Sequence, residues 1–451
     1  MKTKTLSTVF LFITLLMAPQ MASGQLPKET EAQKVQRMKW WTDARFGMFI
    51  HWGLYALPAR HEWVKNNERM TNEQYEKYFK MFNPDLYDPH EWAKRAKTAG
   101  MKYVVLTAKH HEGFCLFDSK FTDYKATNTP YGKDLIKEYV EAFRAEGLKV
   151  GFYYSLIDWH HPDYTIDRVH PLRQESDTAY ARLNKGRDMN KYRAYIKNQV
   201  RELLTNYGEI SIIWFDFSFP GKNGKGHEDW DSENLLKLAR SLQPGIIVDD
   251  RLDLRDVEGG FDFISPEQVK VAKWPEVNGK RVAWETCQTF SGSWGYYRDE
   301  NTWKSPAQLL ELLIESVSKG GNLLLNVGPT ARGVFDYRAQ ERLKSMGEWM
   351  KYNSRSIYKC TEAPAEYDVP DNTLLTYNPV TKRLYVHLLA YPMGRLTLTN
   401  IADKVEYVQF LHDASEVKFS AGRDANKNDL TLQLPVQKPP VEIPVLEIYL
   451  K

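Results

Sequence analysis

The sequence predicts a (β/α)8 TIM-like barrel, an α/β fold, followed by a C-terminal all-β sandwich domain. Between about residues 45 and 330, about eight strand-like runs alternate with amphipathic helical stretches. No G-x-G-x-x-G or G-x-x-x-x-G-K-[ST] follows a strand, which argues against the alternative, a doubly wound open sheet. Beyond about residue 355 short alternating runs follow, separated by turn residues, as in a β-sandwich.

The barrel strands are predicted from short apolar runs with β-branched and aromatic residues. They are Gly47–His51, Tyr103–Thr107, Val150–Tyr154, Ser211–Phe215, Ile246–Val248, Asp262–Ile264, Val282–Trp284 and Leu323–Val327. Amphipathic periodicity predicts helices at Pro89–Ala99, Lys133–Glu146, Lys191–Tyr207, Ser232–Leu242 and Pro306–Lys319. Gly100, Gly147 and Gly208 stand where a helix ends in a left-handed residue.

A further helix near Tyr337–Tyr352 precedes the change of pattern. The strands expected after it are Thr373–Tyr377, Arg383–Leu389, Arg395–Leu398, Val405–Leu411, Leu430–Leu434 and Ile443–Leu450. The predicted domains are therefore a signal peptide (1–24), a catalytic barrel (25–355) and a β-sandwich (356–451).

The first 24 residues have the pattern of a cleavable signal peptide. Lys2 and Lys4 precede the apolar stretch Val9–Ala18, and Ala22-Ser23-Gly24 supplies small residues before a cut near Gln25. No Cys follows that stretch, and no other segment is apolar for long enough to span a bilayer. We expect an exported protein, periplasmic or secreted, with no membrane anchor.

Composition narrows the ligand classes. The net charge is +3, of which Lys2 and Lys4 contribute two, so no basic field is expected to bind nucleic acid.

Cys115, Cys287 and Cys360 are too far apart for a disulfide framework or a metal site, and we expect buried thiols, with one bridge left open. The oligomeric state is left open.

One stretch points to chemistry: Ile212-Ile213-Trp214-Phe215-Asp216-Phe217. A lone carboxylate at the end of a buried strand is costly to desolvate unless something requires it. Catalytic groups of barrel enzymes lie at the carboxyl ends of the strands. The alternative is a solvated loop aspartate just past the strand.

Other predicted strand ends also carry polar groups. They are His51-Trp52-Gly53, Lys109-His110-His111-Glu112, Tyr153-Tyr154-Ser155, Asp249-Asp250-Arg251, Ser265-Pro266-Glu267 and Trp284-Glu285. The His-x-His pair of barrel amidohydrolases is missing, because Gly53 stands two residues after His51, and there is no G-x-S-x-G elbow. We expect no metal site and no cofactor.

A pair of carboxylates on this rim fits glycoside hydrolysis, which needs a nucleophile and a proton donor. Asp216 suits the nucleophile if a His or Arg faces it. Glu267, beside Pro266, suits the donor, which needs an apolar surrounding or a neighbouring negative charge. His, Tyr and Trp side chains without a basic cluster fit a neutral sugar.

These residues resemble the α-L-fucosidases of glycoside hydrolase family 29, from about Trp40 to Trp349 and more loosely beyond. The matching stretches are Arg45–Gly53, Glu62-Trp63, Thr107–Phe114, Trp214–Asp216 and Lys319–Pro329. The resemblance implies the same two-domain fold and a retaining exo-hydrolase that removes terminal α-L-fucose from glycans.

By the same resemblance, Asp216 is the nucleophile and Glu267 the acid/base, with Glu285 as a rival for the second role or as a substrate contact. The fucose contacts carried over are His51, Glu62, Trp63, His110, His111, Tyr153, Trp214 and Arg251. The alternative readings are a core histidine at His51 and a structural role for one of His110 and His111. Trp294 would line the pocket or support a lid.

Two other functions remain open at this point. One is hydrolysis of a related sugar such as α-L-galactose, since an apolar wall at the methyl group discriminates by only ~1–3 kcal/mol. The other is a non-catalytic carbohydrate-binding protein of the same fold.

Overall fold

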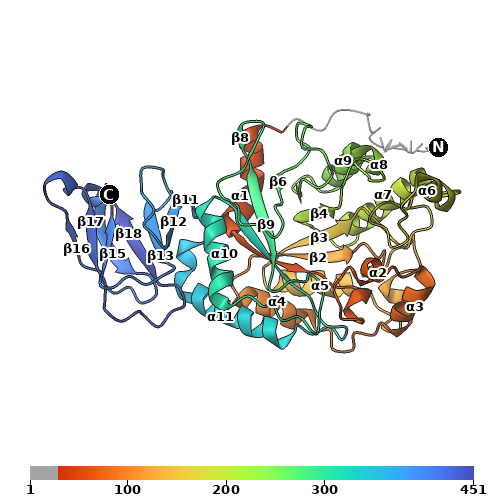
Figure 1. The fold of residues 1–451 in the computed structure, drawn as a ribbon, viewed down its shortest axis with the longest axis horizontal. Coiled ribbons are helices and arrows are strands. Elements are labelled where there is room, and N and C mark those ends of the chain that lie inside the picture. The colour runs from red at the N-terminus through yellow and green to blue at the C-terminus, as the bar shows by residue number, and fades with distance from the viewer. Residues whose placement is uncertain (1–28) are drawn as a thin grey trace, which may run out of the picture.

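The structure, a computed structural model, describes residues 29–451. The predicted signal peptide lies outside the described residues. Figure 1 shows two bodies, a large α/β barrel and a smaller β-domain beside it.

Eight parallel strands form the barrel sheet, in the order β5-β4-β3-β2-β1-β10-β9-β6. They are β1 (Phe46–Ile50), β2 (Tyr103–Lys109), β3 (Lys149–Ser155), β4 (Ile212–Asp216), β5 (Ile247–Val248), β6 (Phe263–Ile264), β9 (Ala283–Thr289) and β10 (Asn322–Val327). Parallel pairing of neighbouring strands through crossovers confirms the predicted barrel.

The sheet is not fully closed, because its two edge strands, β5 and β6, do not pair with each other. Asp262 joins them: its N–H donates to the Val248 carbonyl at 2.8 Å, and its carboxylate accepts from the Val248 N–H at 2.9 Å. Arg37 of α1 (Glu31–Ala44) binds the same carboxylate at 2.7 Å. The Asp262 carboxylate thus makes one of the hydrogen bonds to β5 that a neighbouring strand would otherwise make.

The outer helices follow the strands with two exceptions. The helices are α4 (Pro89–Thr98), α5 (Leu135–Ala145), α7 (Met189–Thr205), α9 (Ser232–Leu242), α10 (Pro306–Ser318) and α11 (Tyr337–Asn353). No helix separates β5 from β6 in the described chain, and the hairpin β7 (Glu276–Val277) and β8 (Lys280–Arg281) stands between β6 and β9.

Short helices are inserted after the carboxyl ends of three strands. They are α2 (Val64–Asn67) and α3 (Asn72–Met81) after β1, α6 (Asp177–Leu183) after β3, and α8 (His227–Trp230) after β4. They gather at the end of the barrel away from the β-domain (Figure 1).

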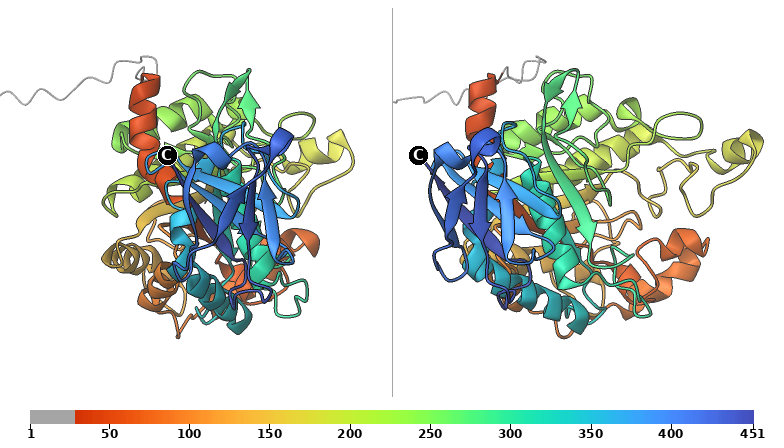
Figure 2. Two further views of the ribbon diagram at one scale, coloured as in Figure 1. Left: turned by 90° about the vertical axis from the view of Figure 1, so that its left-hand side faces the viewer. Right: turned by 60° about the vertical axis from the view of Figure 1, so that its left-hand side comes forward.

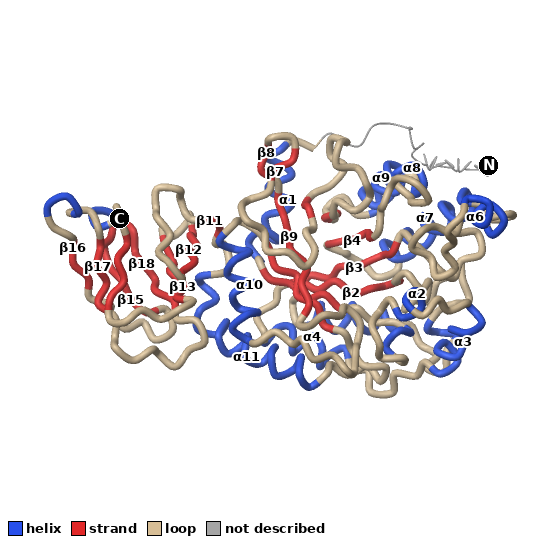
Figure 3. The backbone as a smooth tube through the Cα atoms, viewed as in Figure 1, coloured by secondary structure: helices blue, strands red, loops and turns tan. Residues whose placement is uncertain are grey.

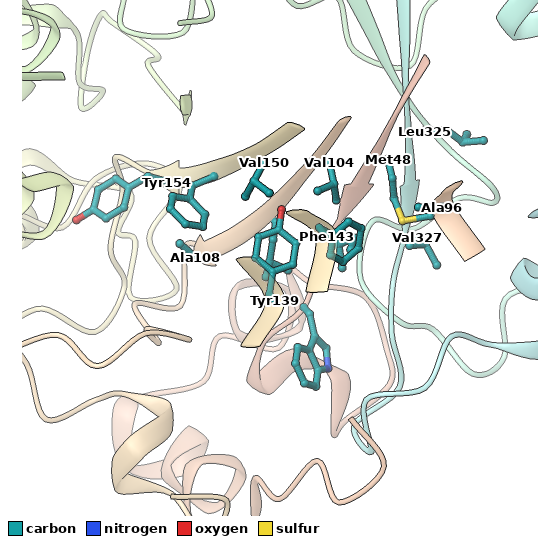
Figure 4. Packing of buried hydrophobic residues seen from close by; sticks show 14 of the residues in the cluster. Met48, Ala96, Val104, Ala108, Tyr139, Phe143, Val150, Tyr154, Leu325 and Val327 are labelled. Atoms are coloured by element: carbon teal, nitrogen blue, oxygen red, sulfur yellow. The ribbon is translucent and has the colours of Figure 1, made fainter. Parts of the chain in front are cut away.

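Alternation along the strands divides the core into two layers. Met48, Val104 and Val150 point outward and pack on helix residues such as Ala96 and Phe143 (Figure 4). The intervening residues point into the barrel, and this inner cluster includes Phe49, Tyr103, Tyr153 and Trp214. The inward residues nearest the carboxyl ends are therefore placed to line a site.

Gly47 shows how tightly the barrel floor is filled. A Cβ built on Gly47 would lie 2.3 Å from the ring of Tyr103, so the glycine leaves the space which that ring occupies. The floor is a packed core, as expected for a barrel of this size.

One predicted strand was wrong in extent. The sequence predicts Val282–Trp284, whereas β9 runs from Ala283 to Thr289. Thr286 and Gln288, which look like loop residues, are both 3% exposed inside the fold. Trp284-Glu285 consequently lies in the first half of the strand and not at its carboxyl end.

The β-domain has a five-stranded antiparallel sheet, in the order β11-β12-β13-β18-β15, and a three-stranded sheet, β14-β17-β16. The strands are β11 (Thr361–Glu362), β12 (Thr373–Asn378), β13 (Arg383–Leu388), β14 (Arg395–Leu398), β15 (Val405–Phe410), β16 (Phe419–Ala421), β17 (Leu430–Gln433) and β18 (Val445–Leu450). They form a group separate from the barrel strands (Figure 3). Apolar residues of both sheets share one core, as in a sandwich.

The β-domain packs against the amino-terminal side of the barrel through α10 and α11. Trp349 of α11 donates to the Ile443 carbonyl at 2.8 Å, and Arg355 binds Glu447 at 2.8 Å. Figure 2 shows this domain in blue in front of the barrel. No helix of the described chain is long and apolar enough to cross a bilayer.

Candidate active site

A cavity of about 410 Å3 is built at the carboxyl ends of the barrel strands. It brings together ten of the eleven site residues predicted from the sequence. These are His51, Glu62, Trp63, His110, His111, Tyr153, Trp214, Asp216, Arg251 and Glu267. The eleventh, Glu285, lies elsewhere.

Asp216 is the last residue of β4, and its side chain is held from two sides. The Tyr153 hydroxyl donates to Oδ2 at 2.6 Å, and Arg251 Nη1 donates to Oδ1 at 2.8 Å. Burial raises the pKa of the Asp216 carboxyl, and the Arg251 guanidinium opposes that rise by favouring the ionised form. Asp216 is 7% exposed, so it is a cavity residue and not a solvated loop aspartate.

Arg251 connects the two candidate catalytic carboxylates. Its Nη1 binds Asp216, and its Nη2 lies 2.8 Å from Glu267 Oε2. Its Nε donates to Ser265 Oγ at 3.1 Å, and the guanidinium lies 4.4 Å from the ring of Trp214. One rigid cation therefore fixes the relative position of both acids.

Of the two surroundings expected for Glu267, the structure has the neighbouring negative charge, Asp216, and not the apolar one. Instead of an apolar pocket, its side chain is 40% exposed and paired with Arg251, against 10% for Asp216. Its backbone is fixed by a bridge to Cys287 of β9. A sugar bound in the cavity would have to remove much of this exposure.

His51 is a neutral hydrogen-bond acceptor toward the cavity. Asn326 Nδ2 donates to the Trp294 carbonyl at 2.7 Å, so its Oδ1 accepts the 2.7 Å bond from His51 Nδ1. Burial lowers the pKa of His51 to about 3. The neutral ring then carries its proton on Nδ1, and Nε2 keeps a lone pair. His51 is thus a buried histidine that also lines the cavity.

His111 has the same arrangement. The Ser155 hydroxyl donates to the Ile157 carbonyl at 2.6 Å, so Ser155 Oγ accepts from His111 Nδ1 at 2.8 Å. Nε2 lies 3.8 Å from Asp216 Oδ2, and burial keeps the pKa of His111 well below its usual value. Both imidazoles present acceptors that suit sugar hydroxyl donors.

His110 packs on His111 with ring centroids 3.9 Å apart and stacks on Tyr153. Both histidines line the cavity, so neither has a purely structural position. Burial keeps the pKa of His110 well below its usual value, and its Nδ1 has no hydrogen-bond partner among the described residues.

Glu62 anchors the loop that carries Trp294. Its Oε2 accepts the backbone N–H groups of Trp294 and Gly295 at 3.1 and 2.9 Å, and the Ser293 hydroxyl at 3.2 Å. Glu62 is 1% exposed, so its carboxylate binds the backbone of this loop in addition to lining the cavity. Trp294 packs on His51 at 5.0 Å and on Phe49 at 5.9 Å.

Several cavity residues were not predicted from the sequence. They are Phe49, His61, Asn67, Phe217, Gln268, Cys287 and Gly292. Strand alternation could have found Phe49, which points inward two residues before His51. Gly292 and Gln268 lie on loops, where no periodicity marks them. All three cysteines of the chain are buried and unbridged, as expected.

Glu285 is not part of this cavity. It is the third residue of β9, opposite Asn322 at the start of β10, and is fully buried. Its Oε2 accepts a hydrogen bond from Tyr103, the first residue of β2. These contacts lie at the amino end of the barrel, the end away from Asp216, so the predicted rim position of Glu285 was wrong.

Burial raises the pKa of Glu285 to about 8, which gives a stability prediction. The unfolded carboxyl ionises near its ordinary value, while the folded one keeps its proton, so folding loses stability as the pH rises between those two values. Glu285→Gln should remove this loss, at most about 1.4 kcal/mol per pH unit. Urea-unfolding midpoints of both proteins at about pH 5.5 and about pH 7.5 measure it. An equal pH dependence in the two proteins would contradict a protonated Glu285.

Within residues 29–451 no group of three or more His, Cys, Asp or Glu side chains is arranged to hold a metal ion. The cavity is lined instead by three carboxylates, one guanidinium, imidazoles and aromatic rings. This is a set for binding hydroxyl groups and for acid–base and nucleophilic chemistry at one carbon.

Comparison with known proteins agrees with this geometry. A sequence model described as alpha-L-fucosidase matches residues 14–355. Plasma alpha-L-fucosidase of Homo sapiens is 30% identical over 391 residues, which cover 80% of this chain and 78% of that protein.

The solved structures similar to this chain are also alpha-L-fucosidases. Alpha-L-fucosidase isoenzyme 1 from Paenibacillus thiaminolyticus has a TM-score of 0.86 and 45% identity, covering 93% of this chain and 99% of that one. A family 29 alpha-L-fucosidase from Bacteroides thetaiotaomicron, trapped as a covalent intermediate with 2-fluoro-fucosyl fluoride, has a TM-score of 0.79 and 27% identity, covering 95% and 98%. The chain belongs to the alpha-L-fucosidases of glycoside hydrolase family 29.

Proposed function

We propose that this protein is an exo-acting, retaining α-L-fucosidase in which Asp216 is the nucleophile and Glu267 the general acid/base. The observation that carries the proposal is the pair of carboxylates in one cavity, both bound to Arg251. Paired carboxylates are the common catalytic set of glycoside hydrolases.

In the first step, Asp216 attacks the anomeric carbon of fucose, and the glycosidic bond breaks. Glu267, protonated, gives its proton to the departing oxygen, and a covalent fucosyl-enzyme forms. Tyr153 and Arg251 hold the attacking carboxylate in place and favour its ionised form. The trapped intermediate of the Bacteroides relative supports this covalent step.

In the second step, Glu267 is ionised and takes a proton from water. That water attacks the anomeric carbon, the bond to Asp216 breaks, and fucose leaves with its original α configuration. Two inversions at one carbon account for retention. The exposure of Glu267 suits this role, since water has to reach it.

Hydroxyl recognition is assigned to the neutral groups of the cavity. His51 and His111 offer lone pairs at Nε2, and Trp63 and Trp214 offer indole rings. Phe49, Phe217 and Trp294 supply apolar lining, which favours a deoxy sugar over its hydroxylated analogue, α-L-galactose.

The test is hydrolysis of 4-nitrophenyl α-L-fucoside beside the corresponding α-L-galactoside, with NMR of the first sugar anomer released. Fucose released first as the α anomer, and faster than galactose, is the expected result. Faster release of galactose would favour the related-sugar alternative, and no turnover of either by folded protein would favour a carbohydrate-binding protein.

We propose further that the chain is exported, on the basis of its first 24 residues. The full-length chain, expressed in a Gram-negative host, should yield a periplasmic protein with its amino terminus near Gln25. N-terminal sequencing and fractionation measure this. A chain that keeps Lys2 and Lys4 and stays in the cytoplasm would contradict export.

A further inference from the structure

A second cavity of about 410 Å3 lies beside the active cavity. Its wall is built by Met70, Thr71 and Asn72 at the start of α3, by Trp159, His160 and Pro162 after β3, and by residues around α6. These segments follow β1 and β3, so both cavities lie at the carboxyl end of the barrel. Figure 1 shows both α3 and α6 at that end of the barrel.

The two cavities share an aromatic wall. Trp63 lines the active cavity and Trp159 the second one, and their ring centroids are 5.2 Å apart at 74°. His111 also lies 5.4 Å from Trp159. Lys65, 1% exposed, fixes the wall by donating to Asn72 Oδ1 at 2.9 Å.

The second cavity is basic where the active cavity is not. Its charged lining residues are Lys185 and Arg187, and no Asp or Glu lines it. Among residues 29–451 neither cation has a carboxylate partner within 4.0 Å. A cavity with unpaired cations and no carboxylate in its wall favours an anion.

Arg187 is held in a fixed orientation. Its Nη1 donates to the carbonyls of Tyr164 at 2.7 Å and Pro162 at 3.1 Å, and its Nε donates to Leu183 at 3.3 Å. Its Nη2 has no hydrogen-bond partner in the described chain. A guanidinium fixed in this way loses little entropy when it binds a carboxylate or sulfate.

His170 adds a buried donor to the same wall. It is 3% exposed, and its Nδ1 accepts the Leu172 N–H at 3.0 Å. Burial lowers the pKa of His170 to about 3, so the ring is neutral and its proton is on Nε2. The cavity thus has donors from Arg187 and His170 in addition to the Lys185 ammonium.

We propose that the second cavity is a subsite for an anionic sugar unit, one that carries a sulfate ester or a carboxylate, on the same glycan whose terminal fucose occupies the active cavity. The proposal rests on the proposed function, since it assigns the part of the substrate that lies past the fucose. The glycan crosses the edge of the Trp63–Trp159 wall, and the anion is bound by Arg187 and Lys185.

The test compares three synthetic fucosyl oligosaccharides that differ only at the sugar next to fucose: neutral, sulfated and carboxylated. Wild type should show kcat/KM about tenfold higher for at least one acidic substrate, the size of one hydrogen bond to a charged group. The preferred substrate, sulfated or carboxylated, shows which of the two anionic groups the cavity binds. Inorganic sulfate, against chloride at equal ionic strength, should inhibit turnover of that substrate and not of 4-nitrophenyl α-L-fucoside.

Variants locate the effect. Lys185→Gln and Arg187→Gln should each lower the acidic preference while keeping kcat/KM for 4-nitrophenyl α-L-fucoside, and Arg182→Gln, an exposed α6 residue outside the cavity, is the matched control. Because Arg187 also holds backbone carbonyls, Lys185→Gln and sulfate inhibition keep the test valid if Arg187→Gln misfolds. Equal rates on neutral and acidic substrates, or a preference that survives Lys185→Gln, would overturn the subsite. Failure on the aryl fucoside itself would instead refute the proposed function.

Discussion

Replacing Asp216 by glycine is expected to lower kcat on 4-nitrophenyl α-L-fucoside by a factor on the order of 10⁴. The substitution removes the only group assigned to attack the anomeric carbon. Tyr153 and Arg251 lose one acceptor, but both border a cavity that water enters, and Arg251 keeps Glu267 and Ser265. We therefore expect the fold to survive.

Azide should restore part of the lost turnover. Glycine leaves room for a small anion beside Arg251, which attracts it to the place of the carboxylate. One displacement inverts the carbon, so the product should be β-fucosyl azide, seen by NMR. Asp216→Asn is the matched control: it removes the nucleophile but fills the space, and azide should not rescue it.

Either of two results would contradict the nucleophile assignment. One is near-normal turnover by folded Asp216→Gly, and the other is azide rescue with retained α configuration. The second would mean that another carboxylate still forms the covalent intermediate.

The sequence predicted the barrel well because its strands are buried on both faces. Runs such as Tyr103–Thr107 and Leu323–Val327 are mostly apolar, and the observed β2 and β10 differ from them by two residues or fewer at either end. Asp216 was found for the same reason, as a lone charge where such a run ends. Burial leaves a clear signal in local sequence.

Contacts between distant segments leave no such signal. The bond of Glu62 to the Trp294 loop joins residues more than 200 positions apart, and the Asp262 link between β5 and β6 depends on barrel closure. The rim position predicted for Glu285 was wrong because β9 contains several polar residues that are buried together with its apolar ones. A polar residue in a strand core looks like a strand end when no tertiary contact is known.

Glu267→Ala should lower kcat/KM for natural fucosyl glycans by about 10³-fold, and that for 2,4-dinitrophenyl fucoside only a few-fold. A sugar alkoxide is a poor leaving group and needs the proton, whereas dinitrophenolate leaves without one. The second step also loses its base, so the fucosyl-enzyme on Asp216 should accumulate and be detectable by mass spectrometry. Azide should react with that intermediate and give α-fucosyl azide, the opposite configuration to that from Asp216→Gly.

Glu285→Gln is the control that separates the two candidate acids. Glu285 is bonded to Tyr103 at the amino end of the barrel, so its amide variant should keep the wild-type dependence on leaving group. If Glu285→Gln instead discriminates against poor leaving groups while Glu267→Ala does not, the assignment of Glu267 is wrong. The barrel floor would then have to open to substrate, against the packing of Gly47 on Tyr103 that fills it.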